Sequence, residues 1–451
     1  MFDSLANIFK IQDLRRKILI TLGLIFIYRI GCFIPTPGVD GQALSQFFEK
    51  LAQKQGATLF GFINLFTGGA LRRLSVFALG IMPYISASII MQLLTAVVPA
   101  LEKIAKEGRA GYEKINQYTR YGTVLLCIIQ GFFLSLWLEN KGNFFGMTIV
   151  PYPGFLFRLN TVVTLCAGTI FIMWLGEQIQ ERGIGNGISL IITASILSRL
   201  PSSLYQIWVF YSPFNPAQRQ ISTFTVVSLF ILWFLVIVGV VLFSQAQRRI
   251  PVQYARRVVG RRVYGGQSTY LPIRVDMAGV IAIIFAQSVL LFPSTLATFF
   301  PKASFLNRIF SQFIRSQGLW YNLSYVILII FFMYFYTAIV FNPVEIANNL
   351  KKYGGFIPGV RPGENTAKYL DYIATRLVFA GAIYISLIAI LPSLIMRTFN
   401  IPSYAIASFF GGTTVLIFVG VMLDTMRQIE SQLILHHYQG FMKKGKLRGR
   451  R

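Results

Sequence analysis

Long apolar runs are the feature that most limits what this chain of 451 residues can fold into. Ten runs are long enough to cross about 30 Å of hydrocarbon as a helix. They lie near residues 18–34, 76–98, 121–138, 159–176, 184–200, 223–243, 275–293, 322–342, 373–396 and 404–423. Only 13% of the residues are charged, against about 25% in an ordinary soluble domain. The sequence therefore predicts an all-α integral membrane protein with ten transmembrane helices.

The basic residues predict how these spans are oriented. If alternate loops lie on opposite sides, one side holds 29 of the 42 Lys and Arg residues and the other holds 12, with Arg29 inside the first span. Lys and Arg concentrate in cytoplasmic loops, so both termini are expected in the cytoplasm. Five spans in residues 1–200 and five in 201–451 would run in opposite directions, which is the topology of an inverted repeat.

The spans lack the groups that most membrane enzymes and proton-coupled carriers use. The 16 acidic residues all lie outside the middle of the spans, and the two histidines, His436 and His437, are in the C-terminal tail. Paired aspartates, metal-ligand clusters and GxxxxGK[ST] loops are missing from the sequence. We therefore expect no enzyme activity, cofactor or metal, and a partner that supplies the energy for any transport. The cysteines Cys32, Cys127 and Cys166 are interpreted as small apolar packing residues.

One apolar stretch suits neither lipid nor water. Residues 59–85 carry Arg72 and Arg73, and each would cost roughly 2.5–3.5 kcal/mol at the centre of a membrane helix. Gly68 and Gly69 interrupt the same stretch. Such a segment is expected to contact other parts of the protein.

Two basic loops, 246–275 and 343–376, are large enough to bind a partner. Glycines and prolines surround Arg361 in "GGFIPGVRPGE", which indicates a structured turn with Arg361 at its tip. A shaped basic projection would fit an RNA-rich partner or an acidic protein face. Alternatively, these charges only set the orientation in the membrane.

Six stretches together resemble the SecY/Sec61 alpha family. They are "GIMPYISASIIMQLL" (80–94), "KEGRAGYEKINQYTRYGT" (106–123), "ERGIGNGISLII" (181–192), "GRRVYGGQSTYLPIRVDMAGVI" (260–281), "GGFIPGVRPGENTAKYL" (354–370) and "FFGGTTVLI" (409–417). One departure is Ala282, where the family usually has a proline. The resemblance implies two inverted halves around a central pore, through which unfolded secretory proteins cross the membrane and from which hydrophobic segments leave sideways into lipid.

The resemblance also implies roles for particular residues. A short plug helix over residues 60–74 would close the pore, a ring of isoleucines would line its narrowest part, a lateral gate would open to lipid, and the basic loops would dock the motor or ribosome. The plug residues are Phe60, Phe66, Gly68, Gly69, Arg72 and Arg73. The ring residues are Ile81, Ile85, Ile192, Ile281, Ile284 and Ile417. The gate residues are Ser86, Gln92, Gln130, Gln287 and Phe292. The docking residues are Arg256, Arg257, Arg261, Arg262, Lys351, Lys352 and Arg361.

The partners and location that the resemblance implies are those of a translocase. They are the small membrane subunits SecE and SecG, the SecA motor ATPase, the ribosome, YidC, SecDF, preproteins with signal sequences and the lipid bilayer of a bacterial inner membrane, in preference to a thylakoid. The competing hypothesis is a secondary transporter with inverted repeats for a small solute. That transporter would need a polar site at the midplane, and the spans offer little beyond Gln, Ser and Thr.

Overall fold

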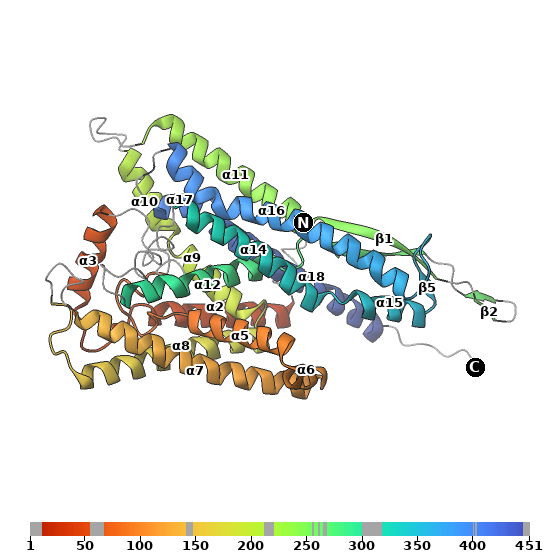
Figure 1. The fold of residues 1–451 in the computed structure, drawn as a ribbon, viewed down its shortest axis with the longest axis horizontal. Coiled ribbons are helices and arrows are strands. Elements are labelled where there is room, and N and C mark those ends of the chain that lie inside the picture. Colours follow the sequence, from red (N-terminus) through yellow and green to blue (C-terminus); the bar gives the residue numbers. More distant parts are fainter. Residues whose placement is uncertain are drawn as a thin grey trace. The chain divides into compact units, whose positions relative to one another are not determined.

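The computed structural model describes residues 11–54, 67–140, 148–211, 221–254, 257–259, 262–264, 268–299, 318–399, 401 and 404–444 (Figure 1). The helices are α2 (Gln12–Gly31), α3 (Gly41–Lys54), α5 (Met82–Val97), α6 (Pro99–Lys106), α7 (Arg109–Glu139), α8 (Phe155–Arg182), α9 (Gly187–Leu197), α10 (Leu200–Tyr211), α11 (Thr223–Gln245), α12 (Gly279–Phe299), α14 (Leu319–Val340), α15 (Pro343–Lys352), α16 (Glu364–Phe399), α17 (Tyr404–Phe410) and α18 (Thr413–Lys444). The strands are β1 (Gln247–Tyr254), β2 (Arg257–Val259), β3 (Arg262–Tyr264), β4 (Ser268–Arg274) and β5 (Gly355–Phe356).

The predicted helical membrane architecture is confirmed. Each of the ten apolar runs overlaps one helix or two consecutive helices of the described chain, although residues 76–81 of the second run form turns before α5. Seven helical segments in the described residues are long and apolar enough to cross a membrane, or eight if the bent pair α5 and α6 counts as one span. This pair bends by 99° at Val98, directly before Pro99, because proline disfavours helical geometry in the preceding residue. The exact count of ten remains a prediction.

The chain divides into two compact units. Unit 1 contains residues 1–222, 401–409 and 417–451, and unit 2 contains residues 223–400 and 410–416. Most of α18 therefore belongs to the same unit as the first helices of the chain. The expected halves, 1–200 and 201–451, and their inverted symmetry remain predictions.

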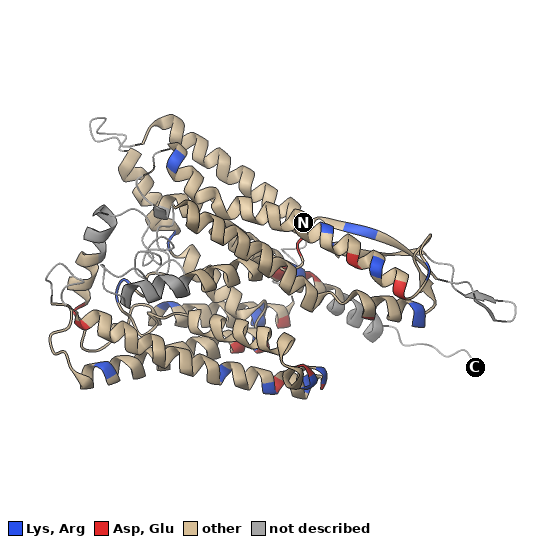
Figure 2. Cartoon of the chain, viewed as in Figure 1, with Lys and Arg blue, Asp and Glu red and all other residues tan. Residues whose placement is uncertain are grey.

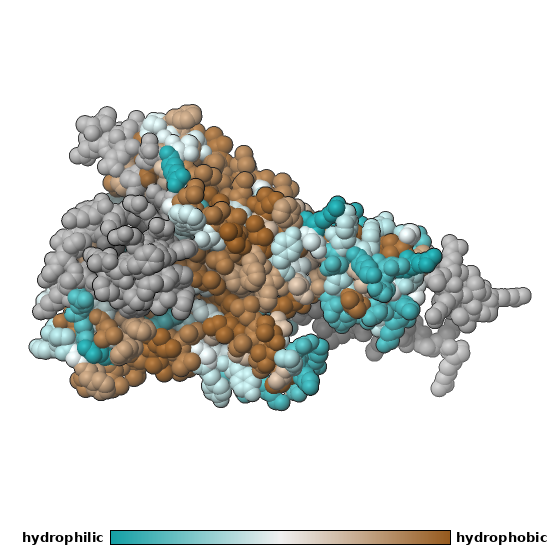
Figure 3. All heavy atoms as spheres, in the orientation of Figure 1, coloured by the Kyte–Doolittle hydropathy of each residue, from teal (hydrophilic) through white to brown (hydrophobic). Residues whose placement is uncertain are grey.

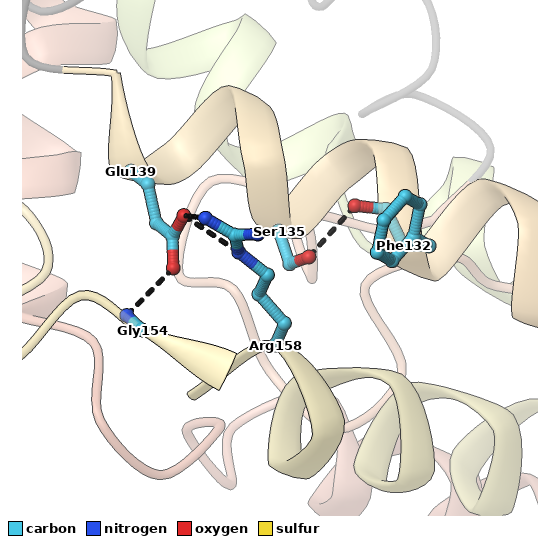
Figure 4. Close-up of polar contacts among 5 residues, drawn as sticks. All are labelled: Phe132, Ser135, Glu139, Gly154 and Arg158. Atoms are coloured by element: carbon cyan, nitrogen blue, oxygen red, sulfur yellow. Dashed lines mark hydrogen bonds and ion pairs between the residues drawn. The ribbon is translucent and has the colours of Figure 1, made fainter. Parts of the chain in front are cut away.

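An ion pair holds each end of the α7–α8 hairpin in unit 1. At one end, Arg120 donates to both carboxylate oxygens of Glu177, over 3.0 and 2.9 Å. At the other end, a carboxylate oxygen of Glu139 accepts from Arg158 Nε over 2.8 Å, and the second oxygen accepts from the Gly154 amide over 2.9 Å (Figure 4). The Glu139 carboxylate thereby fixes the start of α8 to the end of α7.

The two ion pairs are spaced to match a bilayer. Positions 120 and 139 on α7 are 19 residues apart, and so are positions 158 and 177 on α8. At about 1.5 Å per residue the separation is roughly 28 Å, close to the thickness of about 30 Å of the hydrocarbon layer. The charged groups of this hairpin can therefore lie at the two membrane surfaces while apolar residues fill the interval.

We expect Glu139→Ala to weaken unit 1. Glu139 is only 10% exposed and Arg158 is 38% exposed, so removal of the carboxylate leaves a partly buried cation and the Gly154 amide without their acceptor. Breaking a fully buried pair costs about 3–5 kcal/mol, and the partial exposure of Arg158 lowers the expected loss to about 1–2 kcal/mol. Chemical unfolding of the purified protein in detergent measures it. The control is Glu102→Ala, which removes the exposed pair Glu102–Lys106; an equal loss in both variants would contradict this assignment.

Unit 2 combines long apolar helices with a small sheet. α11, α14 and α16 are long apolar helices, and Phe243 of α11 stacks on Tyr384 of α16 at 3.9 Å. At one end of these helices, β1 pairs antiparallel with both β4 and β5, which gives the order β4-β1-β5 (Figure 1). The inward side chains of the sheet and of α16 form an apolar core of Ile250, Val252, Ile273, Ile357, Leu370 and Ile373.

The surface of unit 2 changes character along its length. Large apolar side chains such as Phe224, Phe234 and Leu235 of α11 are between 66% and 79% exposed, as expected for a helix that faces lipid. Figure 3 shows the helices of this unit as largely hydrophobic and the end with the sheet as hydrophilic. Figure 2 shows that Lys and Arg residues lie along β1 and near the end of α15. The sheet therefore forms a basic projection beyond the apolar helices.

Candidate functional site

The segment before α5 consists of turns, and we call residues 67–81 the turn segment. Successive turns are closed by hydrogen bonds such as Ala70 N to Thr67 O and Leu74 N to Leu71 O. Gly68, Gly69 and Leu74 have positive φ angles of 62°, 92° and 40°, a conformation that interrupts an α-helix. The expected plug helix is therefore wrong for residues 67–74. Phe60 and Phe66 lie outside the described residues.

The turn segment is attached to the chain that follows α2. The amide of Thr36 donates to the carbonyl of Leu74, and the amide of Val76 donates to the carbonyl of Ile34, each over 2.9 Å. Arg29 of α2 donates to the carbonyl of Gly68 over 2.8 Å. These bonds satisfy backbone groups that would be costly inside a membrane protein.

Aromatic packing fixes the second part of the turn segment between α2 and α8. Phe77 stacks on Tyr28 of α2 and on Phe171 of α8, with ring centroids 5.8 and 6.1 Å apart. A side chain at Gly31 would collide with the ring of Phe77, and one at Gly168 would collide with the carbonyl of Val76. Glycine at these two places allows the close approach.

The arginines of this stretch lie against protein groups. The guanidinium of Arg73 is 4.4 Å from the ring centroid of Phe33, and Arg72 is half-buried. Ala70, Leu71 and Leu74 on the same segment are at most 5% exposed. The prediction that this apolar stretch contacts other parts of the protein is thus confirmed.

Five of the six ring isoleucines are buried. Ile81 directly precedes α5, Ile85 is in its first turn, and Ile192 is on α9. These three residues and Ile417 of α18 all belong to unit 1 and are at most 5% exposed. In unit 2, Ile284 is 8% exposed and Ile281 is half-buried on α12. The helix continues through Ala282 where the family usually has proline. That the six residues form one ring remains a prediction.

The gate residues lie on three helices and differ in their hydrogen bonding. Ser86 and Gln92 are half-buried on α5, and Gln130 is half-buried on α7. Gln92 donates to Ser88 of its own helix over 3.3 Å. Gln287 on α12 is 2% exposed, and its Oε1 has no hydrogen-bond partner among the described residues. Phe292 is on α12, but its side chain lies outside the described part of the structure.

We expect Gln287→Leu to raise the free energy of unfolding by about 1 kcal/mol, because a buried amide oxygen without a partner costs about 1–3 kcal/mol. Thermal unfolding of the purified protein measures the change. The control is Gln92→Leu, which removes a half-buried amide that already has a hydrogen-bond partner. This control should not raise the free energy of unfolding. A loss of stability in Gln287→Leu would contradict the absence of a partner for Oε1.

The two basic loops form one structured unit, which the sequence reasoning missed. Loop 246–275 contributes β1 to β4, and loop 343–376 adds β5 to the edge of β1 at Gln253 and Tyr254. Arg361 follows β5 and is exposed, and its carbonyl accepts from Thr366 Oγ1 over 2.9 Å. Lys351 and Lys352 are exposed in the last turn of α15. The predicted structured turn is therefore confirmed, with Arg361 exposed on it.

The remaining docking arginines are only partly described. Arg257 and Arg262 lie on the β2–β3 hairpin, opposite Tyr264 and Val259, and their side chains lie outside the described part. Arg256 and Arg261 are outside it altogether. The alternation of the apolar residues Ile250 and Val252 along β1, both of which the structure buries, was the sequence signal that could have revealed this sheet.

A second contact that sequence reasoning missed joins the end of the chain to its beginning. The amide of Gly185, between α8 and α9, donates to Gln428 of α18 over 2.9 Å. Lys17 of α2 donates to Gln432 of α18 over 3.3 Å. Leu14 and Ile184 pack with Ile429 and Leu433 beside these bonds. We call this contact the α2–α18 clasp.

Comparisons with known proteins agree with this arrangement. A profile of the family described as SecY matches residues 75–426. The chain is 46% identical to a protein of Aquifex aeolicus (strain VF5) named protein translocase subunit SecY, over 98% of this chain and 100% of that protein. It is 46% identical to the Escherichia coli (strain K12) protein of the same name, over 97% of this chain and 96% of that protein.

Solved structures share the fold at low sequence identity. One is described as the structure of a protein conducting channel, with a TM-score of 0.63 and 16% identity over 93% of each chain. Another is Sec61 in the canine ribosome-channel complex from the endoplasmic reticulum, with a TM-score of 0.60 and 15% identity over 93% of each chain. The profile match and the near full-length identity lead to one conclusion: the chain belongs to the SecY family.

Proposed function

We propose that this chain forms the protein-conducting channel of a translocase. Unfolded secretory proteins cross the membrane through it, and hydrophobic segments leave it sideways into the bilayer. The observation that carries the proposal is the 46% identity over nearly the whole length to proteins named protein translocase subunit SecY. The turn segment supports it, because an apolar stretch with two arginines packs against α2 and α8 in unit 1 and does not form a membrane-spanning helix.

Two elements together close the resting channel in this proposal. The isoleucine ring excludes water and ions, since a narrow ring of apolar side chains favours dewetting. Residues 60–74 act as the plug. The part from residue 67 is held by backbone bonds, by Arg29 and by the burial of Leu71 and Leu74, and its glycines lower the cost of leaving that conformation. Such a segment can be displaced without unfolding a helix.

The lateral gate involves Ser86, Gln92, Gln130, Gln287 and Phe292. The unpartnered oxygen of Gln287 supports this role, because a buried polar group without a partner makes the described conformation less stable than it could be. A rearrangement that gives this oxygen a partner would recover that free energy. The gate would therefore be poised between two conformations of similar stability.

The basic projection of unit 2 docks the partner that drives transport. The related structures titled as ribosome complexes, canine Sec61 and yeast Ssh1, support a ribosome as one partner. SecA is the proposed motor, and SecE, SecG, YidC and SecDF are proposed membrane partners. The chain itself is not an enzyme in this proposal, and SecA or the ribosome supplies the energy. The bacterial relatives and the charge distribution support a bacterial inner membrane with both termini in the cytoplasm.

A reconstituted transport assay tests the proposal. The full chain is purified with its co-purifying subunits, inserted into lipid vesicles and supplied with SecA, ATP and a labelled preprotein. We expect protease protection of the preprotein that depends on ATP. The alternative, a secondary transporter for a small solute, predicts no protection and no co-purification of small membrane subunits.

A further inference from the structure

Two cations share one exposed aromatic ring at the Gly31 end of α2. The guanidinium carbon of Arg29 lies 5.1 Å from the ring centroid of Phe33, and that of Arg73 lies 4.4 Å from it. Phe33 is 52% exposed. We call these three residues the Arg29–Phe33–Arg73 surface.

The described contacts of this surface include no anionic group. Arg29 donates to the carbonyl of Gly68, and neither Arg29 nor Arg73 pairs with a carboxylate in the described part of the chain. Arg199, just after α9, also interacts electrostatically with Arg29 and Arg72. Like charges gathered at a membrane surface repel each other unless an anion lies near them. The positive charge of Arg29 and Arg73 therefore favours an anionic ligand beside them.

The surroundings indicate where that anion comes from. The first expected span, residues 18–34, ends at this surface, so Phe33 lies near the outer boundary of the hydrocarbon layer in the proposed orientation. Phe26, Ile30 and Ile34 around the surface are between 50% and 66% exposed, and they offer apolar area for acyl chains. A guanidinium stacked on a ring keeps the N–H groups of its edge free for phosphate oxygens. Basic charge next to lipid-facing apolar residues matches a phospholipid better than a soluble anion.

We propose that the Arg29–Phe33–Arg73 surface binds the phosphate of an acidic phospholipid. In the proposed orientation this lipid belongs to the outer leaflet. Arg73 makes the main contact, because it is exposed and has no described hydrogen bond to the protein. Arg29 joins the lipid to the turn segment through its bond to Gly68. A bound lipid would thereby help to hold the turn segment against α2.

Native mass spectrometry of the full chain in detergent tests this inference. The probe is phosphatidylglycerol, with phosphatidylcholine as the zwitterionic comparison and glycerol phosphate as the soluble competitor. The variants are Arg73→Gln and Phe33→Leu. The matched control is Arg182→Gln, which removes an exposed arginine at the C-terminal end of α8. We expect Arg73→Gln to weaken phosphatidylglycerol binding by about tenfold, as for loss of a charged hydrogen bond, and Phe33→Leu to weaken it as well. Arg182→Gln should bind like the parent protein.

Four results would overturn the inference. The first is unchanged phosphatidylglycerol binding by Arg73→Gln, and the second is an equal loss in Arg182→Gln. The third is competition by glycerol phosphate at the concentrations of the lipid, which would indicate a site for small anions. The fourth is a variant Arg73→Gln that keeps the lipid but loses a co-purifying small membrane subunit, which would indicate a protein interface. Binding is compared only among variants with the same unfolding temperature.

Discussion

We expect the Arg361→Glu variant to fold and insert normally but to lose SecA-driven transport. Arg361 is exposed on the turn after β5, and its side chain has no described ion pair, so reversing its charge should change stability by no more than about 0.5 kcal/mol. At a docking surface, the same change replaces an attraction with a repulsion that costs several kcal/mol. Affinity or coupling would then fall by orders of magnitude. Protein level, SecA binding and preprotein transport are measured on the same preparation.

The control for this variant is Arg109→Glu. Arg109 is 93% exposed at the start of α7 and lies on the cytoplasmic side in the proposed orientation. The Arg109→Glu variant therefore changes the net charge by the same amount as Arg361→Glu, but at a site outside the basic projection. If the loops only set the orientation in the membrane, both variants should transport equally well. Normal transport by Arg361→Glu would refute the docking role.

The second large effect is expected from polar substitutions in the isoleucine ring. Ile81→Asn and Ile417→Asn should increase the ion conductance of the resting channel, because an amide in an apolar constriction favours water. The substitutions should also destabilise the protein by about 1–3 kcal/mol, the cost of burying a polar group without a hydrogen bond. Planar bilayer recordings in the absence of preprotein measure the leak.

Leucine at the same positions separates the two effects. Ile81→Leu and Ile417→Leu keep the apolar volume and should leave the channel closed. If the asparagine variants were as tight as the leucine variants, the two isoleucines would be ordinary core residues. A leak in all four variants would mean that packing, and not polarity, maintains the seal.

The helices in the apolar runs could be predicted because a membrane-spanning helix needs about 20 mostly apolar residues, and such runs are plain in the sequence. The described part of residues 59–85 could also be recognised as a segment that packs against protein, because two arginines lie within an apolar stretch. The turns of residues 67–81 were not predicted, because bonds to Ile34, Thr36 and Arg29 hold this conformation, and these partners lie more than 30 positions away. The residues next to a turn in the sequence do not show which distant groups will bond to it.

The sheet of the basic projection and the ion pairs were missed for the same physical reason. β5 has only two residues, and it becomes a strand because β1, about a hundred positions earlier, offers an open edge. Glu139 and Arg158 meet because α7 and α8 are antiparallel, and their spacing along the chain has no helical period. The positions of the six ring isoleucines came from the resemblance alone, since one buried isoleucine has the same pattern as any other.

The α2–α18 clasp has a consequence for how the protein is made. The ribosome makes α2 early and α18 last. The groups of α2 and of the segment before α9 therefore lack their partners on α18 until synthesis is almost complete. Contacts between such distant positions form slowly. Unit 1 cannot be completed in the order of synthesis, and a nascent chain that ends before α18 exposes both an apolar patch and an unpaired amide.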